Sequence, residues 1–177
     1  ILFDEVDVTT MIEIDLEGRN FPLAHVVRGI NKRDNRSIHA EIRSIQANPQ
    51  RSQSADAEKM KFFRLFLLLP TFLRDIGYWF FTRSPHTAKK NIGTVFLTAI
   101  GMFGDGGGWG LTPTIYTLAV TVGGIASRPS IVDGRIEARE YLNLTLSFDH
   151  DIVDGAPAAR FARRFKELLE SGYGLAE

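Results

Sequence analysis

The segment from Ser147 to Gly155 holds the residues best suited to chemistry. It reads Ser-Phe-Asp-His-Asp-Ile-Val-Asp-Gly, with His150 and Asp154 four positions apart. A partly desolvated, neutral imidazole can take a proton from a thiol near pH 7, so His150 is a candidate general base. A core histidine satisfied by one backbone carbonyl is the commoner reason for such a position, and position alone does not decide.

Three roles fit Asp154: it can orient the imidazole, hold an arginine or cap the helix that follows. Capping or a structural ion pair is the favoured interpretation. His150 and Asp154 could also begin a metal site, but the other histidines, His25, His39 and His86, show no paired ligand spacing such as H-x-x-x-H. We therefore predict no metal.

Composition excludes several kinds of chemistry. The chain has no cysteine, so a cysteine nucleophile, disulfides and thiolate metal sites are ruled out, and a reactive thiol must arrive with a substrate. Lys plus Arg and Asp plus Glu both number 21, so the bulk charge favours neither nucleic acid nor an acidic membrane surface. The glycine-rich run from Gly104 to Gly110 matches no phosphate-binding signature and is interpreted as a flexible turn.

The elements around His150 follow from side-chain periodicity. From Tyr141 to Phe148 apolar and polar residues alternate as in a strand, and His150 is predicted to continue the apolar row. Asp133 and Gly134 predict the tight turn that precedes this strand. Beyond Asp154, apolar residues recur at helical spacing, which predicts a helix packed on the sheet.

The rest of the chain predicts a mixed fold. We expect a hairpin from 10–17 and 23–27, a helix over 37–46, a surface loop over 50–58, and strands at 94–102 and 116–122. Strands joined by both hairpins and helices indicate an α+β or mixed α/β sandwich, and 177 residues suffice for one domain. Residues 62–81 are strongly apolar but interrupted by charges, which favours a buried or interfacial helix pair over a membrane span.

The motif D-H-x-x-x-D-G, from Asp149 to Gly155, resembles the active-site signature of the acyltransferase (E2) component of 2-oxo acid dehydrogenase complexes. Residues 93–104 are similar to that family's G-T-F-T-I-S-N-L-G-M-F-G strand, and residues 113–123 resemble its P-I-I…A-I-L-G-V-G stretch. Residues 26–32 and the helix from Ser37 are similar to V-P-V-I-R-N-A-D-K-K-S-L. The resemblance covers most of residues 1–48 and 91–172, but not 49–90.

The resemblance implies a chloramphenicol-acetyltransferase-like fold in one catalytic domain over residues 1–177. It implies homotrimers whose active sites lie between subunits, so the histidine and the facing wall come from different chains. The family's first helices and strand would stand before Ile1, and a further segment or chain is expected to supply them. Lipoyl and subunit-binding modules are missing from this chain, so no lipoyl group is expected on it. A cytoplasmic or mitochondrial-matrix location fits such a protein.

Carried over to this sequence, the resemblance makes His150 the base that deprotonates the thiol of coenzyme A or dihydrolipoamide. Thr98 stands where the family has a serine whose hydroxyl stabilises the oxyanion, and Asp154 matches a residue that supports the site's geometry. The leading hypothesis is therefore a coenzyme A-dependent acyltransferase with no metal and no nucleic-acid partner. A non-catalytic trimeric scaffold or binding module of the same fold is the alternative. A membrane-surface enzyme whose segment 62–81 takes up acyl chains ranks third, and membrane contact is otherwise not expected.

Overall fold

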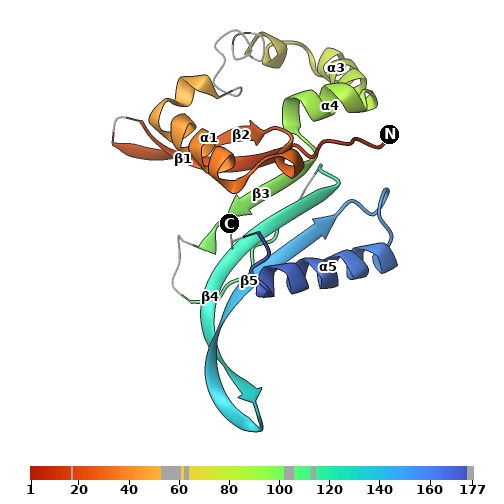
Figure 1. Cartoon of the computed structure of the whole chain (residues 1–177). Coiled ribbons are helices and arrows are strands. Elements are labelled where there is room, and N and C mark those ends of the chain that lie inside the picture. Colours follow the sequence, from red (N-terminus) through yellow and green to blue (C-terminus); the bar gives the residue numbers. More distant parts are fainter. Residues whose placement is uncertain (17, 53–60, 62–63, 102–105, 113–114, 175–177) are drawn as a thin grey trace. The chain divides into compact units, whose positions relative to one another are not determined.

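The computed structural model describes residues 1–16, 18–52, 61, 64–101, 106–112 and 115–174, which belong to two compact units (Figure 1). The first unit comprises residues 1–94 and the second residues 95–177. Both units combine β-strands with helices, as the sequence predicts. A single catalytic domain over residues 1–177 stays a prediction.

The first unit begins with a β-hairpin. Strands β1 (Val8–Leu16) and β2 (Arg19–Val27) pair antiparallel along their whole length. Their neighbour is helix α1 (Asn35–Ala47), whose Ile45 packs with Ile12 and Ile14 in a buried cluster. The predicted hairpin and helix are confirmed, each extended by one to several residues.

Short helical segments flank α1. The 3-10 helices η1 (Ile30–Lys32) and η2 (Pro49–Arg51) precede and follow it. Asp34 is the N-cap of α1, where its carboxylate accepts the Ser37 N–H at 3.0 Å. Most of the loop predicted over 50–58 lies outside the described residues.

Two further helices complete the first unit. They are α3 (Thr71–Arg83) and α4 (Pro85–Ile92), which contact each other. Residues 64–67 are also helical, so the helix pair predicted within 62–81 is confirmed for its described part. Of the two settings predicted for it, buried and interfacial, the first is wrong, because most of its apolar side chains are exposed. Among the described residues, no helix has both the length and the apolar character needed to cross a bilayer.

The second unit is a three-stranded sheet covered by one helix. Strand β3 (Val95–Ala99) pairs parallel with β4 (Leu118–Val132), and β4 pairs antiparallel with β5 (Arg135–Phe148). Helix α5 (Gly155–Glu170) lies along this sheet in Figure 1. It packs through Phe161, whose ring meets that of Phe148 edge-on with centroids 5.6 Å apart.

Two details of the second unit position its chemistry. Asp133 and Gly134 both have positive φ, 49° and 78°, as a tight turn between hairpin strands requires, and this confirms the predicted turn. The β4–β5 register shifts between Val122 and Ile125, so Gly123 and Gly124 form a bulge. Such a bulge bends the strand locally and opens its backbone to a neighbouring segment.

Candidate active site

His150 lies in the turn that joins β5 to α5, and its side chain is exposed. The prediction that it continues the apolar strand row is wrong, because β5 ends at Phe148. The described residues of the second unit therefore leave the imidazole without the desolvating surroundings that the sequence suggested.

Asp149 holds the His150 turn in place. Its backbone N–H donates to the Thr117 carbonyl at 3.1 Å, which ties the turn to the residue before β4. Its carboxylate accepts the Asp151 N–H at 3.1 Å. Its carbonyl accepts the N–H groups of Ile152 and Val153, at 3.1 and 2.9 Å. The sequence motif includes Asp149 but predicted no role for it. Its role could have been predicted from one feature: an aspartate at the end of a strand can form an Asx turn.

Asp154 is the N-cap residue of α5, and its carbonyl accepts the Ala158 N–H at 3.1 Å. Its side chain makes no capping hydrogen bond, so the favoured interpretation of a capping carboxylate is wrong. Within the described part of the chain, no salt bridge involves Asp154, and no three acidic or histidine side chains gather as metal ligands. Its orienting role stays a prediction.

Thr98 lies in β3, half-buried, beside Thr121 of β4 in the parallel register. Thr121 is 1% exposed, and its hydroxyl oxygen lies 2.9 Å from that of Thr112. Neighbouring strands place paired residues on one sheet face, and Thr121 pairs with Thr145 of β5, whereas Phe148 belongs to the other face. Thr98 thus lies on the face opposite Phe148, the residue that leads into the His150 turn.

A glycine-lined hollow of about 350 Å³ lies just beyond the end of β3, at Ile100 and Gly101. Ile100, two residues beyond Thr98, lines it together with the loop from Gly106 to Trp109 and the bulge at Gly123 and Gly124. Trp109 is 61% exposed at this hollow. The hollow is therefore lined by glycine backbone together with Ile100 and Trp109.

The glycine loop is packed tightly against the sheet. A Cβ on Gly107 would stand 2.4 Å from the Ala126 Cβ, and one on Gly110 would stand 2.3 Å from the Ile100 side chain. The Gly124 N–H donates to the Gly108 carbonyl at 3.1 Å. Gly107 and Gly110 thus make close contacts with the sheet, while residues 106–109 are exposed, and the interpretation as a flexible turn stays a prediction; Gly104 and residue 105 lie outside the described part.

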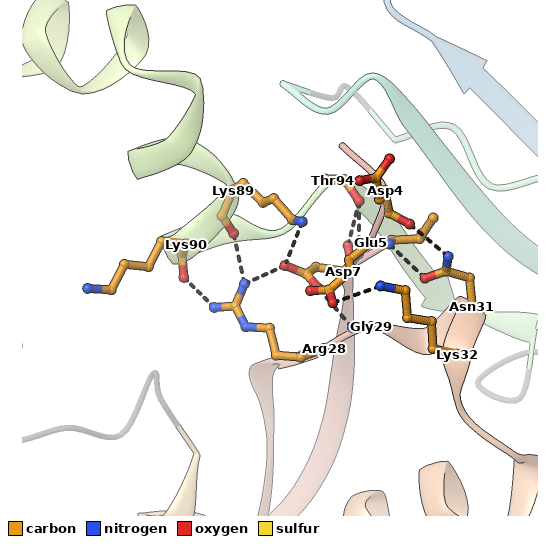
Figure 2. Close-up of polar contacts among 11 residues, drawn as sticks. Asp4, Glu5, Asp7, Arg28, Gly29, Asn31, Lys32, Lys89, Lys90 and Thr94 are labelled. Atoms are coloured by element: carbon orange, nitrogen blue, oxygen red, sulfur yellow. Dashed lines mark hydrogen bonds and ion pairs between the residues drawn. The ribbon is translucent and has the colours of Figure 1, made fainter. Parts of the chain in front are cut away.

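In the first unit a buried ion pair joins the hairpin to α4. Figure 2 shows the Asp7 carboxylate facing Arg28, whose guanidinium donates to it at 2.9 Å and also to the carbonyls of Lys89 and Lys90. These carbonyls belong to the last turn of α4, where a cation is favourable; the Lys89 carbonyl also accepts the Gly93 N–H at 2.9 Å. Arg28 lies in a segment that resembles the family, and its contacts with Asp7 and α4 stabilise the fold.

A second buried cluster fixes α1 on β2. His25 is 4% exposed; its Nδ1 lies 3.2 Å from the Ser52 hydroxyl and its Nε2 lies 2.9 Å from the Glu41 carboxylate. Burial raises the pKa of Glu41, but hydrogen bonds from His25 and Arg33 outweigh it and leave the pKa lowered. Ser52 is only 2% exposed and also bonds the Ala24 carbonyl, so this serine and histidine serve the fold.

Comparison with known proteins identifies relatives of this chain. Residues 86–176 match the model of the family described as 2-oxoacid dehydrogenases acyltransferase (catalytic domain). Over 80 residues, 44% of the chain, it is 40% identical to the lipoamide acyltransferase component of the branched-chain alpha-keto acid dehydrogenase complex of Pseudomonas putida. Over 73 residues it is 40% identical to the dihydrolipoyllysine-residue acetyltransferase component of the pyruvate dehydrogenase complex of Pseudomonas aeruginosa. The matched parts cover only 18% and 13% of those two proteins.

Solved structures confirm the predicted fold. The probable dihydrolipoamide acetyltransferase of Listeria monocytogenes superposes with a TM-score of 0.63 at 22% identity, covering 97% of this chain and 58% of that one. The dihydrolipoamide acetyltransferase of Azotobacter vinelandii gives 0.61 at 21% identity, covering 96% and 55%. Both likenesses cover nearly all of this chain, and thus reach beyond the parts that the sequence resemblance covered.

Proposed function

The chain belongs to the acyltransferase (catalytic domain) family of 2-oxoacid dehydrogenases, and on that premise we propose that it carries an acyl-transfer site. The site moves an acyl group between coenzyme A and the thiol of a dihydrolipoamide-like acceptor. The observation that carries the proposal is the D-H-x-x-x-D-G motif in a turn, fixed by Asp149, that presents His150 at the surface.

In the proposed reaction, the His150 imidazole takes the proton of the acceptor thiol. The thiolate attacks the thioester carbonyl carbon of the acyl donor, and the carbonyl oxygen becomes an oxyanion. The Thr98 hydroxyl donates a hydrogen bond to that oxyanion. When the oxyanion collapses, the bond to the first sulfur breaks and the imidazolium returns the proton to the departing thiolate. No covalent intermediate forms on the protein, which agrees with the lack of cysteine.

The two catalytic groups of one site come from two chains in this proposal. Thr98 lies on the sheet face opposite Phe148, and His150 is exposed beyond the end of β5. In a homotrimer, the His150 turn of one chain faces the Thr98 wall of the next, and this contact supplies the desolvation that the single chain lacks.

Spacing in a solved relative supports these assignments. The structure of the Azotobacter vinelandii enzyme concerns the role of a serine, a histidine and an asparagine in its catalytic mechanism. There the histidine follows the serine by 52 positions and precedes the asparagine by four; here the same intervals run from Thr98 to His150 and from His150 to Asp154. Each position keeps a side chain with related hydrogen-bonding capacity.

A non-catalytic trimeric scaffold is the second candidate. The threonine at position 98 favours it, because the family has a serine there. A scaffold would have no acyl transfer to lose, so the same measurement separates the two functions.

The test is acetyl transfer from acetyl-coenzyme A to dihydrolipoamide by the complete protein that carries this chain. His150→Ala should reduce kcat by roughly 10²–10⁴-fold, the usual share of a general base. His39→Ala is the matched control, since His39 is an exposed histidine on α1. Absence of activity in the wild type would favour the scaffold, whereas activity unchanged by His150→Ala would remove His150 from the mechanism.

A further inference from the structure

The helical hairpin formed by residues 64–83 exposes an unusual amount of apolar surface. Leu68 is 82% exposed, Phe72 63% and Leu65 61%. Its other large exposed apolar or aromatic residues are Leu67, Leu69, Leu73, Ile76, Tyr78 and Trp79. Soluble proteins rarely expose large contiguous apolar patches, and those that occur often mark binding surfaces.

This hairpin, called the apolar hairpin below, is packed internally. A Cβ on Gly77 would stand 2.7 Å from the Phe66 ring, so the ring lies directly on the α3 backbone where glycine leaves room. Phe66 is half-buried by this contact, while its neighbours Leu65 and Leu67 point outward. The exposed residues thus belong to a folded element whose other side is occupied by the contact between Phe66 and α3.

The outer face of α3 has the composition of an interfacial helix. Phe72, Ile76, Trp79 and Arg83 recur at i, i+4, i+7 and i+11, and therefore form one stripe. The Arg83 guanidinium carbon lies 4.6 Å from the Trp79 ring centroid. An aromatic ring and a long cation at the end of an apolar stripe suit the boundary between acyl chains and headgroups.

Charge around the apolar hairpin is strongly one-sided. Residues 59–90 contain seven lysines or arginines and one acidic residue, Asp75, a net charge of +6. Because the whole chain has net charge zero, the remaining residues carry −6. The zero net charge of the whole chain, which argued against binding to an acidic membrane surface, therefore conceals a basic, apolar region.

We propose that the apolar hairpin is a peripheral membrane anchor that binds the surface of an anionic lipid bilayer. Its apolar stripe enters the upper acyl region while Lys61, Arg64 and Arg83 meet anionic headgroups. Helix α3 has 13 residues. At 1.5 Å per residue it extends about 20 Å, too short for a hydrocarbon core of about 30 Å, so it lies in the interface.

An anionic bilayer fits this surface better than a second copy of the chain. In a two-fold contact between copies the basic segment of each would face the same segment of the other, and like charges would repel. A bilayer with anionic lipids neutralises these cations and takes up the apolar side chains at once. This inference does not depend on the acyl-transfer proposal.

The test is co-sedimentation of the complete protein with vesicles of phosphatidylglycerol and phosphatidylcholine, and with vesicles of phosphatidylcholine alone. Binding to the anionic vesicles should be strong and should weaken as salt is raised. Lys61→Gln with Arg64→Gln should weaken it by roughly 25-fold, because each basic residue contributes about fivefold near an anionic surface. Leu68→Glu with Phe72→Glu should abolish it.

The matched control is Ile131→Glu with Ile136→Glu, at two equally exposed isoleucines of the β4–β5 hairpin. These changes add the same charge far from the basic segment in sequence and should leave vesicle binding within twofold of the wild type. All variants are at exposed sites, so unchanged thermal unfolding would verify their fold. The proposal fails if the wild type ignores anionic vesicles, if both glutamate pairs act alike, or if Leu68→Glu with Phe72→Glu changes only the oligomeric state.

Discussion

Thr98 is the catalytic candidate at which this sequence departs from its family, because a threonine stands where the family has serine. Threonine keeps the hydroxyl donor but adds a methyl group that restricts χ1. Its position in β3, half-buried beside Thr121, gives the hydroxyl a rigid support. The donor function therefore depends on one rotamer.

We expect Thr98→Val to lower kcat by roughly 10²–10³-fold, since it removes one oxyanion donor at nearly constant volume. Thr98→Ser should keep activity within a few-fold of the wild type. KM for acetyl-coenzyme A should change little in either variant, because the hydroxyl acts on the transition state. Equal kcat for Thr98→Val and the wild type would remove Thr98 from the mechanism.

At the residue scale, the sequence predicted side-chain types better than side-chain geometry. The motif around His150 was identifiable because its spacing is specific. The capping role expected of Asp154 was wrong: its backbone occupies the N-cap position, but its carboxylate does not turn back to the helix. Residue type sets which rotamers are available, whereas surroundings distant in sequence choose among them.

At the scale of elements, the glycine loop shows how close backbone packing builds the hollow beyond the end of β3. Gly107→Ala should destabilise the protein by about 1–3 kcal/mol, because the new methyl group collides with Ala126 and the buried Asn143 amide. Gly108→Ala is the control in the same loop, since nothing lies within 4 Å of its Cβ position. Urea unfolding of both variants checks this, and equal losses would show that the loop is not packed as described.

The Asp7–Arg28 pair provides an independent check on the first unit. Arg28→Ala leaves the Asp7 carboxylate, 5% exposed, without its closest cation and removes the guanidinium donor from the Lys89 and Lys90 carbonyls. We expect a loss of about 3–5 kcal/mol in the free energy of unfolding. Lys32→Ala breaks the exposed pair with Glu5 and should cost at most about 1 kcal/mol. Similar costs for the two variants would contradict the structural role of Arg28.

Side-chain periodicity predicted the order and type of the elements, but it predicted their first and last residues less accurately. Strand β5 stops at Phe148 because Asp149 directs its hydrogen bonds into a turn, which alternation of apolar residues cannot reveal. The bulge at Gly123 and Gly124 was hidden for the same reason, since it depends on the loop that packs against it. These tertiary contacts overrule local pattern.

At the scale of the whole molecule, the proposed site is incomplete in one chain. The fold resembles the solved acetyltransferases over nearly all of this chain, yet the chain covers little more than half of theirs. The second unit of one chain does not bring Thr98 and His150 together, because Thr98 lies on the sheet face opposite Phe148 and His150 lies beyond the end of β5. The sequence implied this division only through its family, because no pattern in one chain encodes a contact between copies.

Complementation in mixed trimers tests the central claim most directly. Chains with His150→Ala and chains with Thr98→Val, each nearly inactive alone, would be unfolded together, refolded in equal amounts and assayed for acetyl transfer. Random assembly should restore roughly one quarter of wild-type activity, because a quarter of the contacts pair an intact histidine with an intact threonine. A mixture no more active than its two components would contradict a site shared between chains.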